Sequence, residues 1–322
     1  MDKPQSTMAE VARIEEAAER LIKNVNTVIV GKQDAIEFVL VALLCEGHLL
    51  LEDVPGIGKT MLARATAMSL GCIFKRIQCT ADLLPSDVTG IHYFNQKTSQ
   101  FEFRPGPIMA NIVLVDEINR ATPRTQSCLL ECMQEQQVTV DLETINLPRP
   151  FLLLATQNPI EMEGTFPLPE AQLDRFFLKI KLGYPSSEEE GAILFRFQDE
   201  NKLHSLKDVM KAAELLDLQK IIRHILVADP VRSYIVAIIR ATREHPDIRL
   251  GASPRASLGL QAASQALAAI RGRNYVIPDD VKHLAVPALA HRIIAKSEIR
   301  LRGKSVEDIV KDILATVPVP VE

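Results

Sequence analysis

The segment that most constrains the fold of this chain is the run LLLEDVPGIGKT, from Leu49 to Thr60. An apolar stretch suited to a buried strand passes directly into a loop with two glycines, and a helical pattern follows. Gly56 and Gly58 lack Cβ atoms, so they can adopt positive φ and let backbone N–H groups approach phosphate oxygens. Lys59 adds a cation, and Thr60 adds a hydroxyl ligand for Mg²⁺. The run therefore predicts a phosphate-binding loop between a strand and a helix.

The triplet Gly-Lys-Thr is weak evidence by itself, because Gly-Lys followed by Ser or Thr arises by accident in about one chain in six of this length. Its position after an apolar strand and before the helix Met61–Leu70 is the context that the motif requires. One position departs from the general pattern, since Asp53 stands where the first glycine is expected. The nucleotide contacts are expected from Pro55, Gly56, Ile57, Gly58, Lys59, Thr60 and Met61.

Short apolar runs alternate with helical patterns between about residues 48 and 182, which predicts an α/β fold with a parallel sheet covered by helices. Five strands are expected: His48–Asp53, Ile73–Cys79, Asn111–Asp116, Phe151–Thr156 and Phe176–Lys181. Two further stretches read as hairpins inserted into this core, Ile91–Phe103 and Gln137–Leu147.

Strand signals stop after Gly183-Tyr184-Pro185, and helical periodicity follows. Four helices are expected: Ser187–Gln198, Asp229–Glu244, Ser253–Arg271 and Pro278–Ala295. The break predicts a core domain over residues 1–184 and an all-helical domain over residues 185–322.

A second apolar run, Ile112–Val115, ends in the adjacent carboxylates Asp116 and Glu117. The carboxyl ends of parallel strands meet at the edge of the sheet where ligands bind, so these acids are expected near the phosphate loop. Adjacent side chains alternate in direction, which assigns Asp116 to Mg²⁺ and Glu117 to the attacking water of a phosphoryl transfer. An Asp-Glu pair that simply ends a strand in solvent is the alternative.

Three more polar residues are candidates for contacts with a phosphate. Asn158, after the strand Phe151–Thr156, offers a donor and an acceptor to a γ-phosphate or a water, although Asn-Pro also simply ends strands. Arg175 could stabilise charge on a transferred phosphoryl group, or form an ordinary salt bridge with Asp174. Arg255 lies in the first turn of a helix, where anions are favoured, so an external phosphate explains it better.

Composition limits the remaining functions. The net charge of −4 gives no overall attraction for nucleic acid or for an acidic membrane surface. The start, Met1–Asn24, has no apolar signal region, and no apolar run approaches the roughly 20 residues that span a bilayer. These features predict a cytoplasmic protein without membrane insertion. The cysteines lack metal-ligand spacing, so buried free thiols are expected.

Four longer segments, taken together and in this order, resemble the MoxR family of AAA+ ATPases: LEDVPGIGKT, VDEINRA, TQNPIEMEGTFPLPEAQLDRF and GASPRA. The resemblance runs from about Glu16 into the helical domain. It implies a P-loop αβα core with a helical lid, and ATP with Mg²⁺ bound between them. It also implies a homo-oligomeric ring, usually a hexamer, in which the neighbouring subunit completes the site.

The resemblance further implies roles for individual residues. Val30 and Gly31 match the segment that usually lines the adenine pocket, and the two hairpins match the helix-2 insert and the insert before sensor 1. Arg120 is typical of the family, and its role is left open. The other roles are Walker A for Lys59 and Thr60, Walker B for Asp116 and Glu117, sensor 1 for Asn158, a finger acting in trans for Arg175, and sensor 2 for Arg255.

Proteins of this family are commonly linked with partners that carry a von Willebrand factor A (VWA) domain, so a chaperone-like role on such a client is expected by analogy. A DNA-dependent motor is an alternative, because related ATPases with this insert include helicases. Nucleic acid is not the expected partner, since Ile91–Arg104 carries only Lys97 and Arg104 as strong cations, offset by Glu102. A nucleotide-dependent scaffold with little turnover is the third hypothesis.

Overall fold

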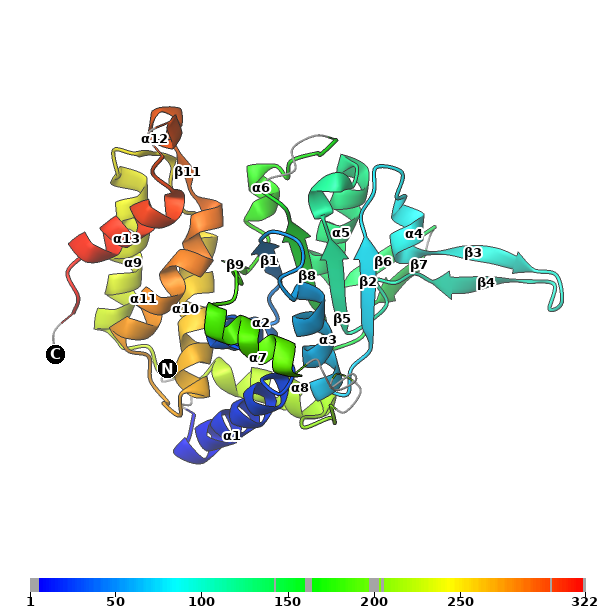
Figure 1. Ribbon diagram of the computed structural model, residues 1–322, viewed down its shortest axis with the longest axis horizontal. Coiled ribbons are helices and arrows are strands. Elements are labelled where there is room, and N and C mark those ends of the chain that lie inside the picture. The colour runs from blue at the N-terminus through cyan, green and yellow to red at the C-terminus, as the bar shows by residue number, and fades with distance from the viewer. Residues whose placement is uncertain are drawn as a thin grey trace.

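The computed structural model describes residues 6–141, 143–159, 164–196, 203, 206–301 and 303–320. Its centre is a five-stranded parallel sheet with the strand order β2-β5-β8-β1-β9 (Figure 1). The strands are β1 (Leu49–Glu52), β2 (Phe74–Gln78), β5 (Ile112–Asp116), β8 (Leu152–Gln157) and β9 (Leu178–Ile180). All five predicted strands are confirmed, with small differences at their ends.

Successive side chains of each strand pack on opposite faces of the sheet. In β1, Leu49 and Leu51 join the apolar cluster that contains α1, α2 and α3, whereas Leu50 joins the cluster that contains α5. The sheet is therefore the middle layer of an αβα sandwich, which confirms the predicted fold class. The helices of the two outer layers are α1 (Met8–Val25), α2 (Gln33–Leu44), α3 (Lys59–Ser69) and α5 (Pro123–Glu135).

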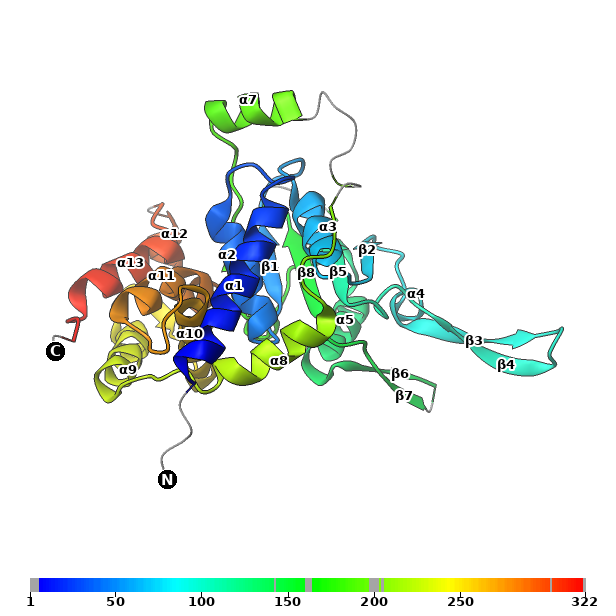
Figure 2. The ribbon, with the colours of Figure 1, turned by 90° about the horizontal axis from the view of Figure 1, so that it is seen from below.

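Both predicted insertions are hairpins. β3 (Gly90–Asn95) pairs antiparallel with β4 (Gln100–Pro105), and a short helix, α4 (Pro85–Thr89), precedes this pair. The hairpin extends far from the sheet in two perpendicular views (Figures 1 and 2). β6 (Gln137–Val140) and β7 (Glu143–Asn146) form the second, shorter hairpin.

The chain after Gly183 is mostly helical, but two expectations about it are wrong. β10 (Ile248–Leu250) and β11 (Ile294–Ala295) form a small antiparallel sheet, so this part is not all-helical. The helix expected over Pro278–Ala295 ends at Leu289. The helices are α6 (Glu170–Leu173), just before β9, and then α7 (Ser187–Arg196), α8 (Ala212–Ile222), α9 (Asp229–Glu244), α10 (Pro254–Ile270), α11 (Pro278–Leu289), α12 (Ser297–Leu301) and α13 (Val306–Thr316).

The early end of α11 has a physical reason. The chain turns through a short 3₁₀ helix, η3 (Ala290–Arg292), which carries His291 and Arg292 into the interior. Burial and the charge of Arg292 lower the pKa of His291 to about 3, so the ring is neutral and Nε2–H donates to the Phe176 carbonyl at 2.9 Å. Arg292 Nη2 donates to the same oxygen at 2.8 Å. These bonds hold the helical part against the start of β9.

Several observed helices are not among the predicted elements, namely α1, α2, α5, α8 and α13 and the short helices α4, α6 and α12. The start of α1 has a readable signal, because Thr7 and Glu10 form a capping box. The predicted end of α7 at Gln198 lies outside the described residues. The domain boundary near residue 184 stays a prediction, since α8 packs against both α2 and α10. Within the described ranges, no helix is long and apolar enough to cross a membrane.

His48 links three elements of the core directly before β1. The side chain is buried, Nε2–H donates to the Met133 carbonyl at 2.9 Å, and Nδ1 accepts from the Leu153 N–H at 3.1 Å. Burial lowers the pKa of His48 to about 4, although the bond to Met133 opposes the shift. Protonation would therefore remove the acceptor on which the Leu153 amide depends.

We expect His48 to make the folded state sensitive to acid. An unfolded histidine has a pKa of about 6.5, so the unfolded chain binds more protons between pH 6.5 and pH 4, and stability falls as the pH falls through this window. His48→Gln keeps one donor and one acceptor but does not titrate. Between pH 7 and pH 5 it should lose about 2 kcal/mol less unfolding free energy than the wild type in urea titrations.

The exposed His224 provides the matched control, and His224→Gln should keep the wild-type dependence on pH. Equal losses in the wild type and in His48→Gln would show that His48 is not the group that responds.

Candidate nucleotide-binding site

The loop after β1 has the backbone that a phosphate site needs. Gly56 and Gly58 adopt φ of +86° and +95°, values that side chains disfavour. A Cβ atom at either glycine would meet no protein atom within 4 Å, so space beside the loop is open to a ligand. Helix α3 begins at Lys59 and directs its first N–H groups and its positive end toward this space.

Lys59 points into the site. Its side chain is buried, and Nζ donates to the backbone carbonyl of Asp53 at 2.8 Å. Burial lowers the pKa of Lys59, and the negative charges of Asp116, Asp53 and Glu117 oppose this shift. The acids at the ends of β1 and β5 therefore lie close enough to Lys59 to stabilise its charged form.

Asp53, which replaces the first glycine of the general loop pattern, makes hydrogen bonds that connect two segments of the core. Its carboxylate accepts the N–H groups of Leu182 at 2.5 Å and of Gly183 at 3.1 Å. The end of β1 is thus bonded to the segment that leaves β9 and leads to α7.

Asp116 ends β5, and each of its carboxylate oxygens has a partner. Oδ1 accepts the hydroxyl of Thr156 at 2.6 Å, and Oδ2 accepts Nη2 of Arg76 at 2.6 Å. Thr156 lies on β8 and Arg76 on β2, the two strands that flank β5. Neither residue was a candidate from the sequence, because their contacts depend on the pairing of strands far apart in the chain.

Glu117 follows in the left-handed conformation, with φ of +56°. Its N–H donates to Thr156 Oγ1 at 2.8 Å, and its Oε2 accepts from Gln78 Nε2 and Arg120 Nη1, each at 3.2 Å. Arg120 belongs to the short 3₁₀ helix η1 (Ile118–Arg120). The contact gives Arg120, whose role the sequence left open, a defined position beside Glu117.

Asn158 lies at the same edge of the sheet. It is buried and follows β8, which runs between β5 and β1. Gln157 is paired with Glu52, and the Asp53 N–H donates to the Gln157 carbonyl at 3.2 Å. Asn158 is therefore level with the start of the phosphate loop.

A cavity of about 430 Å³ adjoins the loop. Gly31, with φ of +69°, lies between two lining residues, and the Glu189 carboxylate of α7 occupies the space that a Cβ would need there. Lys59 and Thr60 lie beside the cavity rather than in its wall. The sequence did not predict the wall contributed by α7 and the segment before it. The lining residues are Val28, Ile29, Val30, Lys32, Pro55, Gly56, Ile57, Gly58, Met61, Leu62, Leu182, Tyr184, Pro185, Glu190 and Ile193.

Arg175 and Arg255 lie together, but not at this loop. Both line a second cavity of about 350 Å³ with Gly47 and His48, which directly precede β1, whereas the phosphate loop follows β1. Within the described ranges neither guanidinium pairs with a carboxylate. The salt bridge considered for Arg175 is made instead by Arg292, whose Nε lies 3.0 Å from Asp174 Oδ1.

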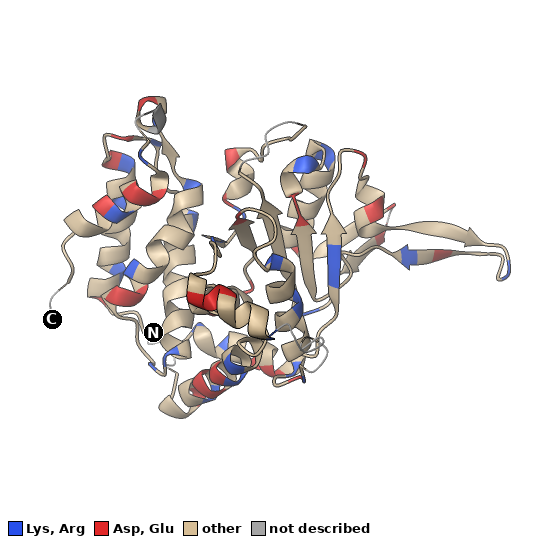
Figure 3. Cartoon of the chain, viewed as in Figure 1, with Lys and Arg blue, Asp and Glu red and all other residues tan. Residues whose placement is uncertain are grey.

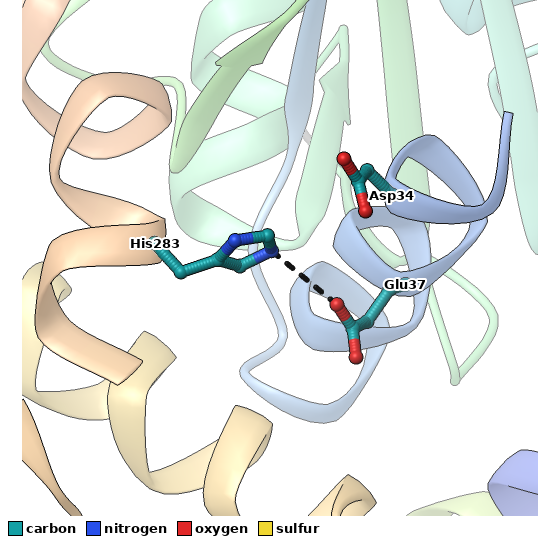
Figure 4. Close-up of side chains that lie close together, drawn as sticks. All are labelled: Asp34, Glu37 and His283. Atoms are coloured by element: carbon teal, nitrogen blue, oxygen red, sulfur yellow. Dashed lines mark ion pairs between the residues drawn. The ribbon is translucent and has the colours of Figure 1, made fainter. Parts of the chain in front are cut away.

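One group of possible metal ligands lies elsewhere, between α2 and α11 (Figure 4). His283 Nε2 is 3.4 Å from Glu37 Oε2, and Asp34 lies nearby. Arg271 also binds Glu37, through Nε at 3.2 Å and Nη2 at 3.1 Å. Burial opposes ionisation of Glu37, but bonds from His283 and Arg271 outweigh it and lower its pKa. This group joins two helices and takes no part in the nucleotide site.

The chain matches two family models. The first, described as the ATPase family associated with various cellular activities (AAA), covers residues 48–178, and the second, an AAA lid domain, covers residues 240–313. A crystal structure from Cytophaga hutchinsonii, described as a candidate ATPase, superposes with a TM-score of 0.91 at 38% identity. That comparison covers 97% of this chain and 98% of the other.

Curated relatives agree with these matches. The uncharacterized protein YeaC of Bacillus subtilis is 50% identical over 303 residues, which are 94% of this chain and 95% of the relative. Chaperone MoxR1 of Mycobacterium tuberculosis is 43% identical over 311 residues, 94% of this chain and 82% of the relative. Together with the loop, the sheet and the lid, these matches show that the chain belongs to the MoxR family of AAA+ ATPases.

Proposed function

We propose that this protein hydrolyses ATP with Mg²⁺ in a homo-oligomeric ring, and that its partners are client proteins that it remodels. The observation that carries the proposal is the convergence of Lys59, Asp116 and Glu117 beside an open glycine loop.

The phosphates are held by the first turn of α3 and by the loop before it. Gly56, Gly58 and Lys59 offer backbone N–H groups, and the ammonium of Lys59 exchanges the Asp53 carbonyl for a phosphate oxygen. Thr60 and Asp116 are the ligands proposed for Mg²⁺, which supplies positive charge for the β- and γ-phosphates. Val30, which lines the cavity, and the adjacent Gly31 are the residues proposed to contact the adenine.

Glu117 is the general base that activates the attacking water. Its carboxylate orients a water molecule and accepts its proton while the water oxygen bonds to the γ-phosphorus and the bond to the β–γ bridging oxygen breaks, releasing ADP and inorganic phosphate. Asn158 contributes a neutral donor and acceptor beside the same atoms. Gln78 and Arg120 must release Glu117 for this role, since both bind its Oε2.

Arg175 and Arg255 act on the ATP of a neighbouring subunit. Both line a cavity at the start of β1, whereas their own phosphate loop follows the end of this strand. The four residues of β1 separate the two ends by roughly 13 Å. A cation at one edge and a phosphate site at the other suit head-to-tail contacts, which close into a ring. The family resemblance favours six subunits.

The client is proposed to contact the hairpin β3–β4. Phe94 and Phe101 stack edge to face near its tip and are 52% and 74% exposed, an apolar surface that suits a polypeptide. A VWA-domain protein is the client that the family resemblance favours, and the relative MoxR1 is named a chaperone. The hairpin itself carries few charged residues (Figure 3), and this does not favour the alternative of a DNA motor.

Four substitutions separate the proposed roles. Lys59→Ala should weaken ATP binding by about 100-fold because charge-assisted hydrogen bonds are lost. Glu117→Gln should bind ATP normally but hydrolyse it about 10²- to 10⁴-fold more slowly, since it cannot accept the proton. Arg175→Ala and Arg255→Ala should bind normally and hydrolyse slowly, the former by about 10³-fold. Calorimetric binding and phosphate release measure the two steps.

The surface pair Arg232–Asp229 supplies a control, and Arg232→Ala should match the wild type in both assays. Unchanged hydrolysis in all four variants would refute the ATPase site. Tight binding without turnover in the wild type would instead favour a nucleotide-dependent scaffold.

Replacing both exposed aromatics of the hairpin tests the client surface. We expect permanently unfolded casein to stimulate hydrolysis by the wild type, and Phe94→Ser with Phe101→Ser to abolish this stimulation without changing the basal rate. Lys97→Ala, on the same hairpin, should behave like the wild type. Stimulation by duplex DNA that falls steeply with salt would favour the DNA motor instead.

A further inference from the structure

Among the described residues, the contacts of helix α7 with the rest of the molecule lie along one side of the helix. Glu189 Oε2 lies 3.6 Å from Lys32 Nζ, and Arg196 Nη1 donates to the Asn26 carbonyl at 2.7 Å. Glu190 and Ile193 line the nucleotide cavity. This inner side of α7 therefore closes the cavity against the segment between α1 and α2.

The outer side of α7 is apolar, and no described part of the chain covers it. At 100° per residue, Gly191 lies opposite Glu189, with Leu194 and Phe195 on either side of it. Leu194 and Phe195 are 72% and 75% exposed, and no atom lies within 4 Å of a Cβ built on Gly191. Figure 2 shows that α7 stands clear of the other helices on this side. We call Gly191, Leu194 and Phe195 the α7 outer face.

This composition is unusual for a solvated helix. Glycine in mid-helix weakens the helix relative to alanine. Two large apolar side chains that stay exposed to water contribute no free energy of burial. A glycine flanked by apolar side chains does favour the close approach of another segment, which fits into the space between them.

We propose that the α7 outer face receives a second copy of this chain, through the surface of α10 that carries Arg255 and Leu258. This inference rests on the proposed ring, and it adds which two surfaces meet. Leu258 lies one turn after Arg255 and is 71% exposed. It lines the second cavity, which Arg175 and Arg255 also line. The two surfaces differ, so the contact is head to tail.

Geometry and charge both favour this occupant. Helix α7 is a wall of the nucleotide cavity, so a copy that brings Arg255 to the phosphates approaches the side on which α7 stands. The exposed Glu188 and Glu190 of α7 give this side negative charge, whereas Arg175 and Arg255 give the α10 side positive charge without carboxylate partners among the described residues. Opposite charges steer the two surfaces together.

Two substitutions, one on each surface, test the contact. Gly191→Arg fits the isolated chain because the space is open, and Leu258→Asp alters an exposed side chain. Sizing by light scattering with a non-hydrolysable ATP analogue should give rings for the wild type and monomers for either variant, with unchanged circular dichroism. Val236→Asp, at an exposed apolar position of α9, is the matched control and should keep the wild-type size.

Mixing the two variants gives the sharpest result. Each retains one intact surface, so an equimolar mixture should form a dimer and nothing larger, and should regain part of the hydrolysis that each variant lacks alone. Should Gly191→Arg not fold, Leu194→Ser with Phe195→Ser replaces it in the same experiment. A mixture that stays monomeric and inactive would overturn the pairing of α7 with α10.

The outcomes also separate this contact from the function on which it rests. Rings of wild-type size in both variants would overturn the contact and leave the ATPase proposal standing. Rings of wild-type size in Gly191→Arg, together with loss of the stimulation by casein, would assign the α7 outer face to a client instead. A wild type that hydrolyses ATP as a monomer would overturn both the ring and the contact.

Discussion

The nucleotide site depends on the two kinds of bond that Asp53 makes at the end of β1. Its backbone carbonyl accepts Lys59 Nζ, and its carboxylate accepts the N–H groups of Leu182 and Gly183. The first bond keeps the lysine inside the site, and the second fixes the chain that leads to α7. A glycine at this position could make only the first bond. The acid that departs from the general loop pattern thus joins the phosphate end of the site to the wall of the adjoining cavity.

The loop and the five strands could be predicted because local pattern and tertiary need coincide there. The run Leu49–Leu51 is apolar because both faces of β1 are covered, and Gly56 and Gly58 are glycines because their φ is positive. The acids Asp116 and Glu117 were expected at the sheet edge because any parallel strand places its carboxyl end there. Such features are set within a few residues of sequence.

The rest depends on contacts between distant segments, which no local pattern contains. Arg76 and Thr156 reach Asp116 only because β2 and β8 pair with β5. The helix α11 ends early because His291 and Arg292 bond to the Phe176 carbonyl, more than a hundred residues earlier. Likewise the position of Arg255 in a first helical turn indicated an external phosphate, but only the packing shows that it lies beside Arg175 and away from its own loop.

Charge balance at the sheet edge gives independent support to the proposed ring. Lys59, Arg76 and Arg120 are the cations found beside Asp116 and Glu117 in the described part of the chain, and two of them bind these acids directly. A triphosphate adds more negative charge than the magnesium ion it brings can cancel, so the same cations would have to serve both acids and phosphates. Further positive charge must come from outside this edge. In the proposed ring, Arg175 and Arg255 would supply it to another copy, because they line a cavity at the start of β1, at the opposite end of this strand from their own phosphate loop.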